Sequence, residues 1–202
     1  TRRFQPVAVD EPDAARCCDM LRGLLGPMEK HHKVHISDAA LVAAVKLSTR
    51  YIPSRQLPDK AVSLLDTASA RVAVSQAAVP AAVEDARAAL AARRAERDAL
   101  VREREIGMAD EARIADTEAA ILSAEQRLTV LDADWAKQRD MVAKIVADRA
   151  AAGGEDGEAA KARLKEALAE LDAAPPDSRM IYPYVDEQSV ASVVADWTGI
   201  PV

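Results

Sequence analysis

The chain has 202 residues, half of them hydrophobic, and a formal net charge of −6. Without a basic excess it does not fit a dedicated nucleic-acid binder, which needs positive charge to meet phosphates. No run of about 18 uncharged apolar residues predicts a membrane span. Adjacent Cys17 and Cys18 cannot build a disulfide framework, so they indicate a reduced, cytosolic chain.

Aromatic residues make up only 3% and alanine is abundant, which predicts a mainly α-helical chain with thinly packed helices. Phe4–Val9 is predicted as a short strand that Pro12 ends. From Asp13 to about Lys30, apolar residues recur every three or four positions and predict a helix. Gly26-Pro27 is expected to interrupt or kink it, and Val34–Ile36 is expected to be extended.

Two prolines shape the next turn. Ser37-Asp38 supplies N-cap oxygens for a helix that should end near Tyr51. Pro53 then stops that helix, and Pro58 begins another, because the first turn of a helix does not need the missing N–H. The stretch RYIPSRQLPDKA at 50–61 is therefore predicted to be a stiff turn between two helices.

The pattern changes after Pro80. Residues 81 to about 105 are rich in Ala, Arg and Glu and predict a helix with a thin apolar stripe. Past Gly107, apolar residues recur at seven-residue spacing and predict a coiled-coil seam: Ile114, Ile121, Leu128, Trp135 and Val142. A return helix over 158–171 completes an antiparallel arm at 80–172.

Compact patterning resumes after the arm. Met180–Val185 is predicted as a short strand, and Asp186 as the cap of a final helix. We therefore expect one small helical domain, 13–79 with 177–202, that carries the arm as an insertion.

The sequence offers few groups for chemistry of its own. It contains no GxxxxGK[ST] loop and no evident Ser-His-Asp, Cys-His or paired-carboxylate constellation. His31 and His35 have a metal-like spacing, but no cysteine is near, so we assign them structural or surface roles and propose no zinc. Arg2-Arg3 could stabilise phosphate charge, although a basic pair alone is usually a solvated surface feature.

Five motifs in register give the chain a family resemblance: TRRFQ at 1–5, LRGL at 21–24, EKHH at 29–32, RYIPSRQLPDKA at 50–61 and WTGIP at 197–201. They resemble the first AAA+ module of Clp-type ring unfoldases over essentially the whole chain. LLGPMEKHH at 24–32, SLLDTA at 63–68 and RVAVSQ at 71–76 are similar to the ClpV-type motors of bacterial type VI secretion. The short arm also favours ClpV over the longer rod of ClpB-type disaggregases.

The resemblance implies roles for named residues. Residues 1–12 would end the large AAA+ domain, where Arg2 and Arg3 match arginine fingers that reach a neighbouring subunit's ATP in a homohexamer. Leu21, Leu57 and Pro58 match positions where the small (lid) domain covers the adenine and ribose of its own subunit's nucleotide. Arg55 and Gln56 occupy the neighbourhood of a sensor arginine in other modules, and neither is assigned a role.

The same resemblance implies a cytoplasmic bacterial motor that uses ATP with Mg to disassemble contracted secretion sheath. Its Walker motifs would lie upstream of Thr1, so this stretch alone is expected to be inactive and to bind no nucleotide tightly. Two alternatives stay open: a ClpB-type protein disaggregase, and a non-enzymatic coiled-coil scaffold or adaptor, which the seven-residue spacing alone would support.

Overall fold

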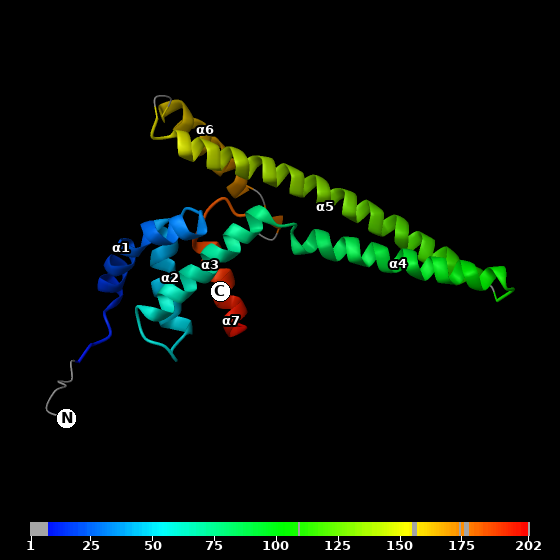
Figure 1. The fold of residues 1–202 in the computed structure, drawn as a ribbon, viewed down its shortest axis with the longest axis horizontal. Coiled ribbons are helices and arrows are strands. Elements are labelled where there is room, and N and C mark those ends of the chain that lie inside the picture. The colour runs from blue at the N-terminus through cyan, green and yellow to red at the C-terminus, as the bar shows by residue number, and fades with distance from the viewer. Residues whose placement is uncertain (1–7, 109, 155–156, 174, 176–177, 202) are drawn as a thin grey trace. The chain divides into compact units, whose positions relative to one another are not determined.

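The computed structural model describes residues 8–108, 110–154, 157–173, 175 and 178–201 (Figure 1). Within them it forms seven helices and no strand: α1 Ala14–His32, α2 Asp38–Tyr51, α3 Asp59–Ala77, α4 Ala81–Glu105, α5 Glu111–Ala151, α6 Gly157–Ala173 and α7 Glu187–Thr198. The predicted mainly α-helical class is confirmed. The chain divides into two compact units, Thr1–Gln76 with Tyr182–Val202, and Ala77–Ile181.

The first unit is a bundle of α1, α2, α3 and α7 (Figure 1). Its helices begin where side chains accept first-turn amides: Asp13 Oδ1 from Arg16 N at 2.8 Å, and Ser37 Oγ from Ala40 N at 3.1 Å. The apolar faces meet in one core, whose largest fully buried side chains include Leu21, Ile36, Leu41, Leu64, Leu65, Val72, Val185 and Val190. Small residues such as Ala40 and Ala61 are also fully buried in this core.

The strand predicted at Met180–Val185 is wrong. Only Val185 pairs, in an isolated bridge with Ile36: Val185 N donates to His35 O at 2.8 Å, and Ser37 N donates to Val185 O at 3.1 Å. Pro183 interrupts the run because it has no N–H to give a ladder. Side chains also take the neighbouring amides, so no partner strand is needed. Ser75 Oγ accepts from Tyr182 N at 3.2 Å.

Two N-terminal expectations have different outcomes. Ala8 and Val9, the described end of the strand predicted at Phe4–Val9, have no strand structure, and the rest of that segment lies outside the described residues. The expected break at Gly26-Pro27 is absent, since α1 continues through Pro27 to His32. Proline leaves the carbonyl four residues earlier without its partner. Gly23 and Pro27 are both exposed, so water can reach that turn.

The second unit consists of α4, α5 and α6. α4 packs antiparallel along one part of α5, and α6 packs along another (Figure 1). The ion pairs between α4 and α5 include Arg87 with Asp132 at 3.0 Å and Arg94 with Glu125 at 2.7 Å. The partners are seven residues apart on both helices, which is the spacing by which charged flanks set helix pairing.

Burial in α5 follows the seven-residue spacing in part. Ile114, Ile121 and Val142 are buried, whereas Leu128 and Trp135 are only half-buried. The facing helix α4 is rich in alanine, and such a thin surface covers large side chains incompletely.

Gln138 on α5 forms hydrogen bonds with the backbone at the start of the segment that was predicted as a strand. Its Nε2 donates to Ser178 O at 2.8 Å, and its Oε1 accepts from Met180 N at 2.7 Å.

Candidate functional site

The candidate site is the turn between α2 and α3, residues 52–58. The Ile52 amide makes the last α2-type bond, to Ser48 O at 3.0 Å, and Pro53 follows. Helical bonding resumes when Lys60 N donates to Gln56 O at 3.2 Å and Val62 N donates to Pro58 O at 3.0 Å. The two prolines thus flank the turn as the sequence predicts, and the Leu57–Pro58 peptide is cis.

Two charged side chains contact the ends of this turn. Lys60 Nζ donates to the Ile52 carbonyl at 3.4 Å, and Glu11 Oε1 accepts from the Leu57 amide at 2.6 Å. Lys60 is 5% exposed although it is charged. Glu11 comes from the segment before α1, 46 residues away in the sequence from Leu57. The turn is therefore fixed by groups from two separate parts of the chain.

The Cys17 thiol lies in the same neighbourhood. It is fully buried, and burial is the main reason why its pKa is raised above the ordinary value. Cys18 and the Glu11 carboxylate raise this pKa further, and the Lys60 ammonium lowers it. Cys17 therefore stays a neutral, unreactive thiol near pH 7, and both Glu11 and Lys60 lie close enough to act on it.

The turn's outer face carries Arg55. Its Nη2 lies 2.6 Å from Asp59 Oδ2 and donates to Ser63 Oγ at 3.1 Å. The Arg55 side chain therefore contacts the first turns of α3. The Gln56 side chain is exposed, so the structure assigns neither residue a place on a ligand.

The five residues that the sequence assigned to the site differ in whether the structure describes them and in how far they are buried. Arg2 and Arg3 lie outside the described residues. Leu21 and Leu57 are 1% and 7% exposed and share the core of the first unit, while Pro58 is half-buried. Of these three, Pro58 offers the most surface to a ligand. Their contact with nucleotide stays a prediction.

Sequence reasoning missed Lys60 and Glu11. A signal for Lys60 exists, because it precedes Leu64 by four residues and Ala68 by eight and therefore lies on the buried face of α3. A lysine at a core position calls for an explanation. Glu11 gives no such signal, because its contact joins segments that are distant in the sequence.

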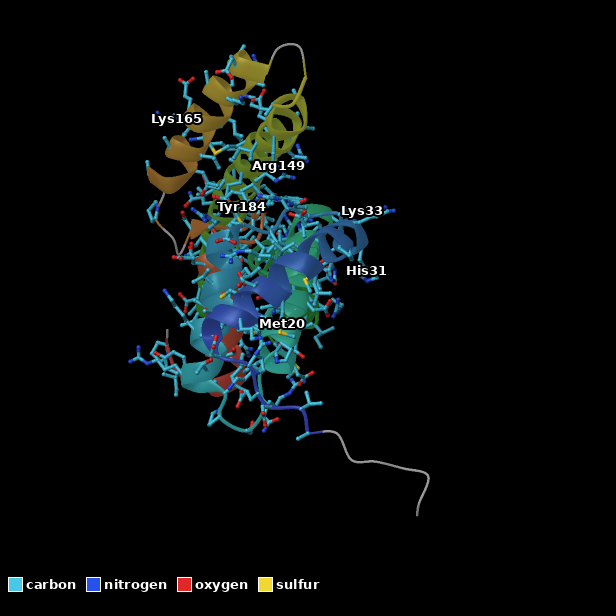
Figure 2. The ribbon with its side chains drawn as sticks, turned by 90° about the vertical axis from the view of Figure 1, so that its left-hand side faces the viewer. Met20, His31, Lys33, Arg149, Lys165 and Tyr184 are labelled. Atoms are coloured by element: carbon cyan, nitrogen blue, oxygen red, sulfur yellow. The ribbon has the colours of Figure 1, made fainter. Side chains whose placement is uncertain are left out.

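Polar pairs also join α1 to its neighbours. Arg22 Nε and Nη2 donate to the two Asp38 carboxylate oxygens at 2.8 and 3.1 Å, which links α1 to α2. His32 Nε2 lies 2.8 Å from Asp66 Oδ1 on α3. Figure 2 shows α1 with Met20 and His31 along it and Lys33 just beyond its end. These pairs fix the helix that contributes Leu21 to the core.

The described part of the chain has no group of three or more His, Cys, Asp or Glu that could hold a metal ion. No helix in that part is long and apolar enough to cross a membrane. What the turn offers is apolar surface at Pro58, with Leu57 behind it.

Residues 13–119 match the family described as "AAA lid domain". The chain belongs to this family. Along its whole length the chain is 46% identical to the AAA+ ATPase ClpV1 of Pseudomonas aeruginosa and 40% identical to the chaperone protein ClpB of Yersinia enterocolitica. It covers 25% and 24% of those proteins, so it spans about a quarter of their length.

Among solved structures, the chain resembles the S. cerevisiae Hsp104-ADP complex, with a TM-score of 0.61 and 26% identity over 99% of this chain and 32% of that one. The match includes residues of both units. These similarities identify the chain as a Clp/ClpB-type AAA+ segment and disfavour an unrelated coiled-coil scaffold.

Proposed function

We propose that this chain supplies the nucleotide lid and a regulatory arm to a Clp-type AAA+ ATPase of the ClpV kind. The main support for this proposal is the 46% identity to ClpV1 over the whole chain, arm included. In this proposal the complete protein is a homohexamer in the bacterial cytoplasm. It uses ATP hydrolysis to disassemble contracted type VI secretion sheath for reuse.

The lid's own contribution is to cover the bound nucleotide. When bound elsewhere in the ATPase, ATP with Mg would supply the phosphoryl group that is transferred to water, and ADP would remain as the product. Pro58 and Leu57 would cover the adenine and ribose, and Leu21 would support them from the core, where it is 1% exposed. Arg2 and Arg3 would reach a neighbouring subunit and stabilise charge on the transferring phosphoryl group.

The arm, 80–172, would regulate or stabilise the ring. Its long α5 helix and the pairing of α4 with α5 suit a structural or regulatory element better than a catalytic one. This role rests on the similarity to ClpV1 and on the presence of a second compact unit.

A second candidate is a ClpB-type disaggregase. It is favoured by 40% identity to a ClpB over the whole chain and by the fold shared with Hsp104. The two functions differ in substrate: a contracted sheath for the first, and aggregated protein with a partner chaperone for the second.

The test uses the complete ATPase that carries this chain. We expect purified protein with ATP to disassemble contracted sheaths, measured by electron microscopy and light scattering, and to leave heat-aggregated protein unrecovered when partner chaperone is added. Arg2→Ala and Arg3→Ala should each depress ATP hydrolysis while hexamers persist. Intact sheaths together with aggregate recovery would favour the disaggregase, and unchanged hydrolysis in both variants would remove the arginine-finger assignment.

A further inference from the structure

We propose that Glu11 and Lys60 form a two-point clamp that positions the 52–57 turn, and with it Leu57 and Pro58, for nucleotide. The inference rests on the proposed function, because it assigns positioning residues to the surface that would cover the base. Neither side chain is proposed to touch the nucleotide.

Lys60 is an unusual choice for its position. It is 5% exposed, and it lies in the first turn of α3, where the helix dipole disfavours a cation. No ion pair with a described carboxylate offsets its charge; its hydrogen bond goes to the Ile52 carbonyl. An apolar residue would suit the buried face better. Core packing therefore does not explain why a lysine occupies this position.

The position of the ammonium explains the choice of lysine. Ile52 is the C-cap of α2, where carbonyls lack helical partners and the dipole is negative. A cation is favourable there, and Lys60 brings one from the start of α3. The side chain thus ties the end of one helix to the beginning of the next, across the turn that joins them.

Glu11 fixes the other end of the turn. Its carboxylate accepts from the Leu57 amide at 2.6 Å, a charge-assisted hydrogen bond on the residue directly before Pro58. Between the two fixed atoms, residues 53–56 are exposed, and Arg55 adds contacts with Asp59 and Ser63 on the outer face of the turn.

Glu11 also connects the clamp to a segment of the chain outside the α2–α3 connection. It belongs to the segment that precedes α1, whereas the turn belongs to the α2–α3 connection. A movement of the segment before α1 would therefore be transmitted to Leu57 and Pro58 through one hydrogen bond. A clamp of this kind would couple the lid surface to whatever precedes it in the ATPase.

The test measures binding of a fluorescent ADP to the complete ATPase, well below its melting temperature. We expect Lys60→Met and Glu11→Ala each to weaken binding about tenfold, a loss typical of a hydrogen bond to a charged group. The double variant should lose much less than a hundredfold, because either change frees the same turn. Lys60→Arg, which keeps charge and donors, should recover part of the affinity.

Two matched controls separate the clamp from a general loss of stability. Lys46→Met removes an exposed lysine of α2, and Asp10→Ala removes the exposed acid beside Glu11; both should bind ADP within about twofold of the wild type. Circular dichroism checks that each variant is folded. If Lys60→Met does not fold, Glu11→Ala decides, because Glu11 is exposed and its loss leaves the core intact.

The outcomes distinguish the two proposals. Wild-type protein that binds no ADP would overturn the proposed function. Wild-type binding together with a folded Glu11→Ala variant that binds equally well would overturn the clamp alone, as would strictly multiplicative losses in the double variant. Reduced affinity in the clamp variants, with unaffected controls, supports the clamp.

Discussion

Leu64→Ala should be one of the most damaging single substitutions in the first unit. Leu64 is fully buried on α3 and belongs to the core that Leu21 and Leu57 share. The change removes about three buried carbon groups at roughly 0.8 kcal/mol each. A residual cavity of about 40 Å³ would add about 1 kcal/mol. We therefore expect a loss of about 3 to 3.5 kcal/mol in the free energy of unfolding.

The assay is urea unfolding followed by tryptophan fluorescence. The chain has two tryptophans, Trp135 on α5 and Trp197 on α7, so a Trp135→Phe background makes Trp197 the reporter of the first unit. Val74→Ala serves as the matched control on the same helix, because Val74 is 61% exposed; it should cost less than about 0.5 kcal/mol.

A Leu64→Ala loss below about 1 kcal/mol, or a loss equal to that of Val74→Ala, would refute the reasoning. Either result would mean that the core of this unit collapses around the missing side chain, or that α3 does not carry the packing that its burial indicates.

Three further predictions concern capping, acid stability and the arm. Asp186→Ala should cost about 1 kcal/mol in urea unfolding, because Asp186 Oδ1 caps Ser189 N at 2.7 Å in a capping box; an unchanged midpoint would contradict it. Asp38 has its pKa lowered from 3.8, chiefly by the hydrogen bond from Arg22. The stabilisation from this lowered pKa is present above the unfolded-state value and is lost as pH falls through the folded one. Asp38→Asn should therefore lose less stability than the wild type between pH 5 and about pH 2 to 3, and parallel pH curves would refute this. Glu125→Arg should destabilise the arm by less than about 1 kcal/mol through repulsion of Arg94, both side chains being partly exposed. Arg94→Glu added to Glu125→Arg should restore the pair, and thermal unfolding in a double-mutant cycle measures the coupling; a coupling of zero would contradict a stabilising interaction between these two side chains.

Helices were the most predictable feature of this chain because their signals are local. Ser37 caps α2 as predicted, and Pro53 and Pro58 flank the turn. The strand prediction at Met180–Val185 failed because β-branched composition does not provide a partner strand. The Met180 and Tyr182 amides of that segment donate to Gln138 Oε1 and Ser75 Oγ, and these bonds take the place of a ladder.

The candidate site was only partly predictable. The sequence drew attention to Leu57 and Pro58 through the two prolines and the family motifs, but it gave no account of how the turn is held. The contact between Glu11 and Leu57 spans 46 residues, and no pattern along the chain encodes it. Lys60 was visible as a charged residue on an apolar face, although its partner was not.

The sequence by itself therefore determined most helix boundaries, which side of each helix is apolar, and the family, because caps, prolines, periodicity and motifs act over a few residues. The break predicted at Gly26-Pro27 was the exception, since α1 runs through Pro27. Only the tertiary structure decided that Lys60 is buried against the end of α2 and that Glu11 reaches the Leu57 amide. Those contacts depend on how distant segments pack, and packing sets which side chains lose water and which atoms come within hydrogen-bonding distance.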